Sequence, residues 1–180
     1  MNTLLVVDMQ NAWLNRETPR LDKAGVIARI NHAAQCTRTQ GGKVIFVQHC
    51  DENSIEGSED WQIDADLIVI EGDGKVNKTA CDSFAETNLQ EQLIACGTST
   101  LIVCGLATEF CLDTTIRAAP SLGFDVVVLS DAHTTGDRPH MKAAAIIEHH
   151  NWVWANMSVP GGHTLKVQTT AQVFPALVLF

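Results

Sequence analysis

Short apolar runs alternate with segments of helical periodicity along this chain, and that alternation limits the possible folds more than any other feature. Five of the runs are suited to short buried strands, at residues 3–7, 44–47, 67–70, 101–104 and 126–129. A sixth strand is expected where apolar and polar residues alternate through Leu165 and Val167. Strands that alternate with helices predict a parallel α/β sheet with helices on both faces. No linker or internal repeat divides the sequence, so we expect one domain over residues 1–180.

Helices are expected between these strands, because apolar residues recur three and four positions apart there. They are predicted at residues 21–40, 89–96, 112–119 and 139–155. Gly41 and Gly97 are expected to end the first two helices. Pro120 is expected to end the third and Pro139 to lie in the first turn of the fourth, since proline lacks the amide hydrogen that an internal helical position needs.

The composition describes a compact globular protein and excludes several classes of partner. Of the 180 residues, 46% are hydrophobic and 18% are charged, which is typical of a folded domain. The formal net charge is -9 and no basic cluster is present, so neither nucleic acid nor an acidic membrane surface is an expected partner. No apolar run approaches the roughly 20 residues that span a bilayer. The first residues have the pattern of a core strand rather than of a signal peptide, so a cytoplasmic location is expected.

The chain has six cysteines, and their spacing does not indicate disulfides. No C-x-x-C pair is present, and the expected compartment is reducing. Most of these thiols are interpreted as small buried hydrophobic groups, so a catalytic role for any one of them needs independent support. They are Cys36, Cys50, Cys81, Cys96, Cys104 and Cys111.

That support comes from residues 105–115, which follow the apolar run at 101–104 and lead into a helix. A strand, a tight turn and a helix place a side chain at the mouth of an open sheet. Cys111 lies where the helix begins, and unpaired backbone N–H groups and the positive end of the helix dipole favour an anion there. We therefore expect the thiol to lose its proton easily, and our central hypothesis is that Cys111 attacks a carbonyl carbon.

Other reactive side chains also lie at predicted strand ends. Asp8, His49, Cys111 and Asp131 all follow apolar runs, and ligands of open α/β sheets bind beyond the carboxyl ends of the strands. A thiol, a carboxylate and a lysine would form a working set, in which the carboxylate moves the proton of the thiol and the lysine stabilises the negative charge. The chemistry alone does not choose among the 21 acidic residues.

Three segments narrow that choice because they resemble the signature segments of the isochorismatase-like cysteine hydrolases. They are LVVDMQ at 5–10, KTACDSF at 78–84 and GLATEFC at 105–111, in the same order as in the family. That family includes nicotinamidases, carbamoyl-amide hydrolases and isochorismatases. The resemblance implies a six-stranded parallel sheet with helices on both sides. It also implies that Asp8 is the general base and acid, Lys78 the lysine of the triad and Cys111 the nucleophile.

The same resemblance implies an oxyanion hole. The family has a cis peptide bond that corresponds to Leu106-Ala107 in this sequence. This bond would direct the N–H of Ala107, together with that of Cys111, towards the oxyanion.

The sequence departs from the family's metal-binding members at one point. Metal-binding nicotinamidases carry an Asp-x-His pattern after the second strand, whereas this chain has Gln48, His49, Cys50 and Asp51 there. We therefore expect no catalytic metal and no cofactor. A soft-metal site formed by His49 with Cys50 and Asp51 remains an alternative, as does a role for His49 in lining the pocket or supporting a loop.

The substrate is expected to be a small molecule whose identity the sequence does not give. Gln10, Trp13, Trp61 and Phe110 are the predicted substrate-binding residues, because each is close in sequence to a triad segment or to the long polar loop at 50–65. The leading function is metal-independent hydrolysis of an amide, ureide or carbamoyl C–N bond through a thioester on Cys111.

Two alternatives to this function remain, and one expectation concerns assembly. The first alternative is an isochorismatase-type hydrolase of a vinyl ether, which needs acid catalysis and no thiol. The second is a non-enzymatic scaffold for ligand binding or assembly. The apolar tail at 174–180 is expected to dock on the core or on a second subunit, so a homo-oligomer is the expected assembly.

Overall fold

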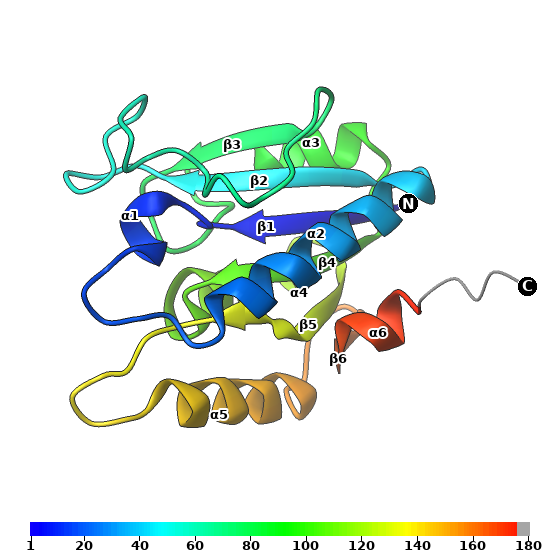
Figure 1. The fold of residues 1–180 in the computed structure, drawn as a ribbon. Helices are drawn as coiled ribbons and strands as arrows, with labels where there is room; N and C mark the ends of the chain where they lie inside the picture. Colours follow the sequence, from blue (N-terminus) through cyan, green and yellow to red (C-terminus); the bar gives the residue numbers. More distant parts are fainter. Residues whose placement is uncertain (176–180) are drawn as a thin grey trace, which may run out of the picture.

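Six parallel strands form one sheet in the order β3-β2-β1-β4-β5-β6. The structure is a computed structural model, and it describes residues 1–175. The predicted α/β sheet is confirmed, and Figure 1 shows its strands side by side. The strands are β1 (Asn2–Val7), β2 (Lys43–His49), β3 (Gly74–Lys78), β4 (Thr100–Leu106), β5 (Asp125–Thr134) and β6 (Leu165–Gln168).

Helices cover both faces of the sheet, as predicted. One buried cluster packs α2 and α6 against the sheet, and a second packs α3, α4 and α5 against the opposite face. In Figure 1, α2 crosses in front of the strands. The helical elements are α1 (Asn11–Leu14), α2 (Lys23–Thr39), α3 (Leu89–Ala95), the π-helical turn η1 (Thr108–Leu112), α4 (Asp113–Ser121), α5 (Ala143–Ala155) and α6 (Thr170–Val173).

The central strand β1 shows why this sequence forms a sheet that is buried on both faces. Leu4 and Val6 belong to the cluster under α2, whereas Leu5 and Val7 belong to the opposite cluster. Because successive side chains of a strand point to opposite faces, a continuous apolar run fills both layers of core. All four side chains are at most 1% exposed.

The carboxyl ends of the strands meet at a single edge of the sheet. In Figure 1 the arrowheads of β1, β2 and β3 point to this edge, on the left. The segments 15–22, 50–66 and 135–142 gather at the same edge, together with α1. Residues that follow different strands are thereby brought together, which is the usual position of a ligand site in an open α/β sheet.

The prediction of a third strand at 67–70 is wrong. The strand lies at β3 instead, and the earlier segment is irregular, with Ile68 57% and Ile70 48% exposed. Side chains satisfy its backbone: the N–H of Ile68 donates to Asn31 Oδ1 at 2.8 Å, and that of Ile70 to Asp73 Oδ2 at 2.9 Å. These contacts replace the ladder of a strand.

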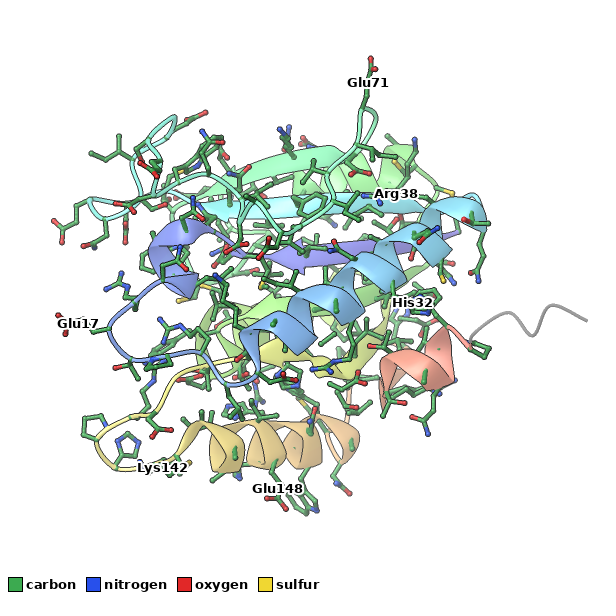
Figure 2. The ribbon with its side chains drawn as sticks, in the orientation of Figure 1. Glu17, His32, Arg38, Glu71, Lys142 and Glu148 are labelled. Carbon is green, nitrogen blue, oxygen red and sulfur yellow. The ribbon has the colours of Figure 1, made fainter. Side chains whose placement is uncertain are left out.

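Arg38 attaches this irregular segment to α2. One guanidinium nitrogen lies 2.6 Å from Asp73 Oδ2 and 3.0 Å from the carbonyl oxygen of Ile68. Figure 2 shows Arg38 near the end of α2, beside the loop whose tip carries Glu71. The apolar residues at 67–70 therefore belong to a segment bound to a helix rather than to the sheet.

Two helix boundaries also differ from the expectation. Pro120 lies inside α4, which ends at Ser121, because a proline so close to the end of a helix removes only one late hydrogen bond. Pro139 precedes α5, which begins at Ala143 after a turn. Asp137 accepts the backbone N–H of Ala143 at 2.9 Å and so satisfies one of the free donors at the start of that helix.

β5 is longer than predicted, and this changes the role of Asp131. The strand leaves its register with β4 after Val128 and pairs again through His133 and Thr134. Asp131 lies in the irregular part, where it accepts the backbone N–H and the hydroxyl of Thr170 at 2.8 and 2.7 Å. Although Asp131 follows an apolar run, its carboxylate therefore binds the start of α6 and is not part of the site.

The chain end is described only in part. Phe174 is 3% exposed and packs in the cluster under α2, so this part of the tail docks on the core. Residues 176–180 lie outside the described residues, and the homo-oligomer stays a prediction. Within residues 1–175, no helix has both the length and the apolar character that crossing a membrane would require.

A buried histidine connects β5 to the turn that carries Cys111. His133 is 2% exposed, and its Nδ1 lies 2.9 Å from Thr108 Oγ1 while its Nε2 lies 3.1 Å from Asn151 Oδ1. Asn151 donates its own amide to the carbonyl oxygen of Ser130, which leaves its Oδ1 to accept from the histidine. Neutral His133 thus donates from Nε2 and accepts at Nδ1. Burial lowers the pKa of His133 to about 4.

This histidine should make the fold less stable in mild acid. Its pKa in the folded protein lies below the unfolded value, so the unfolded chain binds the proton first as the pH falls. Between about pH 7.5 and about pH 5, the free energy of unfolding should fall by about 2 kcal/mol from this residue. Urea denaturation of the wild type and of His133→Gln at both pH values measures the effect. An unchanged pH dependence in the variant would contradict this assignment.

Candidate active site

Three side chains from three strand ends converge at the carboxyl edge of the sheet. Asp8 directly follows β1, Lys78 is the last residue of β3, and Cys111 lies in η1 after β4. Lys78 Nζ lies 2.8 Å from Asp8 Oδ2. An oxygen of Asp8, a ring nitrogen of His49 and the sulfur of Cys111 all lie within 4.8 Å of one another. The structure therefore places the three predicted triad residues together.

Lys78 is a buried cation, and every hydrogen of its ammonium group has an acceptor. Its side chain is 0% exposed, and Nζ lies 2.8 Å from Asp8 Oδ2, 3.0 Å from His49 Nδ1 and 3.0 Å from the carbonyl oxygen of Ala80. Burial lowers the pKa of Lys78, but the negative charges of Asp8 and Cys111 outweigh burial and raise it. The residue is therefore a fixed positive charge.

Asp8 has one oxygen bound and the other free. Oδ2 accepts from Lys78, while Oδ1 is buried and has no hydrogen-bond partner. Burial raises the pKa of Asp8, and the charge of Lys78 opposes that increase. The free oxygen of a carboxylate whose pKa is raised suits a group that accepts a proton and later gives it back.

The pKa of Cys111 shifts in the direction opposite to our expectation. Burial is the largest cause and raises the pKa, the negative charge of Asp8 raises it further, and Lys78 lowers it. A helix terminus contributes only about 0.3–1 kcal/mol, which burial beside a carboxylate exceeds. The carboxylate of Asp8 therefore opposes ionisation of the thiol, whereas the ammonium group of Lys78 favours it.

The turn before Cys111 has the expected backbone. The peptide bond Leu106-Ala107 is cis, as the resemblance implied. Gly105 has a φ of 122°, and a Cβ at this position would lie 2.2 Å from the carbonyl oxygen of Val7. Only glycine fits where β4 approaches β1 so closely. Ala107 and Cys111 both line the pocket.

A pocket of about 330 Å³ opens beside Cys111, which is within the size range of small-molecule sites. Two of the four predicted substrate-binding residues line it, Trp13 and Phe110. Phe110 is 51% exposed, so its ring lies at the mouth. The complete lining is Asp8, Trp13, Arg16, Arg20, His49, Cys81, Leu106, Ala107, Phe110, Cys111 and Arg138.

The other two predicted binding residues, Gln10 and Trp61, do not line the pocket. Gln10 is 0% exposed, and its amide donates to the carbonyl oxygens of His49 and Trp61 and to the hydroxyl of Ser54. Its oxygen accepts the N–H of His49 at 2.7 Å. All the contacts of this side chain are internal, so Gln10 fixes the segment 50–66 over β1 and β2.

Sequence reasoning missed three arginines that line the same pocket. Arg16 and Arg20 lie in the segment between α1 and α2, and Arg138 lies between β5 and α5. All three lie in segments at the carboxyl edge of the sheet, where the triad residues also lie (Figure 1). This position could have indicated the three arginines as pocket residues. They were missed because they are not contiguous in the sequence.

The donor atoms of Asp8, His49 and Cys111 are the only group of three or more in residues 1–175 that is arranged to hold a metal ion. The proposed partners of His49 do not complete a second group, since Asp51 lies 3.8 Å away and Cys50 takes no part. Lys78 already donates to the carboxylate and to the imidazole. A cation would have to displace this ammonium group.

Comparison with known proteins identifies the family of this chain. The isochorismatase domain model matches residues 2–171. Streptothricin hydrolase of Streptomyces noursei is 33% identical over an alignment of 145 positions, covering 77% of this chain and 51% of that protein. The chain therefore spans about half the length of that relative.

Two further relatives extend the comparison. Ureidoacrylate amidohydrolase of Stutzerimonas stutzeri (strain A1501) is 30% identical over an alignment of 182 positions, covering 78% of this chain and 73% of that protein. The crystal structure of a cysteine hydrolase from Pseudomonas syringae has a TM-score of 0.86 at 25% identity, covering 96% of this chain and 90% of the other. With a family model that matches nearly its whole length, the chain belongs to the isochorismatase family of hydrolases.

Proposed function

We propose that this protein hydrolyses the C–N bond of a small amide, ureide or carbamoyl compound through a thioester on Cys111. The observation that carries the proposal is the convergence of Cys111 and Asp8 at the wall of a pocket, with the buried Lys78 directly behind Asp8. Each group supplies a function that acyl transfer needs: a nucleophile, a proton carrier and a fixed positive charge.

The first step joins the substrate to the enzyme. The thiol proton of Cys111 moves to Asp8 while the sulfur forms a bond to the carbonyl carbon, whose π electrons move to the oxygen. We assign the N–H groups of Ala107 and Cys111 to the oxyanion, because both residues line the pocket in the turn that carries the sulfur. Lys78 keeps the total charge of the site balanced as the proton moves.

The second step releases the amine. The oxyanion collapses, the C–N bond breaks, and the nitrogen takes the proton that Asp8 had received. Ammonia or an amine leaves, and the acyl group remains on the sulfur. The raised pKa of Asp8 helps here, because a carboxylic acid that is too strong would hold no proton to give.

Water then completes the cycle. Asp8 takes a proton from a water molecule, the resulting hydroxide attacks the thioester, and the C–S bond breaks. The sulfur recovers its proton from Asp8, so the enzyme returns to its starting state. Two relatives support this reaction class, since their names are streptothricin hydrolase and ureidoacrylate amidohydrolase.

Substitution of the nucleophile tests the covalent scheme. Cys111→Ala should lower kcat by about 10³-fold or more, because the acyl acceptor is lost. Cys96→Ala, at the end of α3 on the amino side of β4, is the matched control and should retain activity. Ammonia release measured across a panel of small amides, ureides and nicotinamide gives the rates. Mass spectrometry of a quenched reaction should locate the acyl group on Cys111.

The same variants separate the thioester scheme from vinyl ether hydrolysis. Ether cleavage needs the acid Asp8 but no sulfur. The Asp8→Asn variant would therefore lose ether hydrolysis, whereas the Cys111→Ala variant would still catalyse it. The thioester scheme requires both residues. Turnover by Cys111→Ala at a rate close to the wild type, with no adduct in either protein, would reject the covalent scheme.

Metal removal tests the expectation that the reaction needs no cation. Activity should be unchanged after dialysis against a chelator such as EDTA. Added Zn²⁺ should inhibit, because it would bind Cys111, His49 and Asp8 and displace Lys78. Loss of activity on chelation, with recovery on adding a divalent metal, would show that the metal-free scheme is wrong.

A further inference from the structure

Positive charge gathers at the pocket of a protein that is otherwise acidic. The formal net charge of the chain is -9, yet three arginines line this one pocket. Arg16 and Arg20 come from the segment before α2, and Arg138 comes from the segment before α5. The proposed chemistry at Cys111 uses none of them, so their presence needs another explanation.

One of the three charges is neutralised within the protein. Arg138 Nε lies 2.6 Å from Glu109 Oε1, and its Nη2 donates to Thr135 Oγ1 at 3.0 Å. Its guanidinium also lies 5.2 Å from the centre of the Phe110 ring. Arg138 is therefore fixed at the pocket mouth, and its charge has an internal partner.

The other two arginines have no such partner. Arg20 Nε donates to the carbonyl oxygen of Trp13 at 2.6 Å, and Arg16 Nε donates to that of Ala12 at 3.0 Å. Within residues 1–175, no ion pair joins either guanidinium to a carboxylate. Carbonyl contacts through Nε leave the terminal nitrogens available. Burial lowers the pKa of Arg20, the like charges of Arg138 and Arg16 lower it further, and the negative charge of Glu109 offsets these effects only in part.

The backbone around Arg20 holds this cation in place. Arg20 pairs with Gly136 in an isolated antiparallel bridge, and a Cβ at Gly136 would lie 2.5 Å from Arg20 Nη1. The guanidinium therefore lies against the bare backbone of Gly136. Trp13, whose carbonyl oxygen binds Arg20, is itself fixed by two ring contacts. Its ring centroid lies 5.7 Å from that of His49, edge to face, and 4.6 Å from Arg16 Cζ.

We propose that the substrate carries an anionic group, and that Arg20 and Arg16 bind it while the C–N bond lies at Cys111. Guanidinium groups match the paired oxygens of a carboxylate, and phosphate shares this chemistry. A pocket of about 330 Å³ holds only a small molecule, so one compound spans the arginines and the sulfur. The position of the reacting bond at Cys111 rests on the proposed function. The anion site rests only on the two arginines.

Matched pairs of compounds test the inference in the wild-type enzyme. Succinamate and 3-ureidopropanoate carry a carboxylate, and butanamide and propylurea are their neutral counterparts. A charge-assisted hydrogen bond contributes about 1.5–3 kcal/mol, so kcat/KM should favour each anion over its neutral partner by at least about tenfold. Equal turnover of the members of both pairs would overturn the inference.

Substitution of the arginine locates the effect. Arg20→Gln should raise KM for the anions by about 10- to 100-fold, with kcat and the neutral substrates little changed. Arg117→Gln on α4 is the matched control, because that arginine pairs with Asp113 away from the pocket. Gly136→Ala should give a smaller shift in the same direction by displacing the guanidinium. A fall in kcat for all substrates alike would assign Arg20 a structural role and overturn the inference.

A binding experiment keeps this inference separate from the reaction. The Cys111→Ala variant and the double variant Cys111→Ala, Arg20→Gln are each titrated calorimetrically with every compound and with inorganic phosphate. The anions should bind at least about tenfold more tightly than their neutral partners, and Arg20→Gln should remove that preference. This result would support the anion site even if no turnover is found. If neither anion binds more tightly than its neutral partner, the inference fails while the proposed reaction still stands. Tighter binding of phosphate than of the carboxylates would identify a phosphate group as the anion.

Discussion

The buried contact between Lys78 and Asp8 is the interaction on which the rest of the site depends. Their side chains are 0% and 5% exposed, and 2.8 Å separates Nζ from Oδ2. Removing two charges from water costs several kcal/mol for each ion, so such a pair contributes little net stability. It does fix one positive charge beside the sulfur of Cys111, and that charge favours ionisation of both Asp8 and Cys111.

The sheet supplies this arrangement through the order of its strands. Residues from β1, β3 and η1 are far apart in the chain, but parallel strands bring their carboxyl ends to one edge. Behind that edge, His133 anchors the turn of Cys111 to α5, and Gln10 anchors the segment 50–66 to β2. These buried polar contacts are fully formed, which favours one arrangement of the pocket.

The sequence predicted those parts of the molecule that depend on local pattern. Apolar runs located four of the six strands and an alternating pattern located β6, and the motif around Cys111 identified a residue that the structure places beside Asp8 at the pocket. The run at 67–70 was wrongly assigned, because side chains satisfy its backbone: Asn31, which is distant in the chain, accepts from Ile68, and Asp73 in the following turn accepts from Ile70. The direction of the pKa shift at Cys111 was also wrong, since burial beside Asp8 is a property of the folded site. The arginines of the pocket were missed because they come from different segments and are grouped only in the folded protein.

The central claim is that the carboxylate of Asp8 opposes ionisation of the Cys111 thiol while the ammonium group of Lys78 favours it. The most direct test measures the pKa of Cys111, from the pH dependence of its alkylation by iodoacetamide, in the wild type and in Asp8→Asn. Removing the carboxylate charge should leave Lys78 without its anion, so the thiol should ionise more easily and its pKa should fall. A pKa of Cys111 that is unchanged or higher in Asp8→Asn would contradict the account.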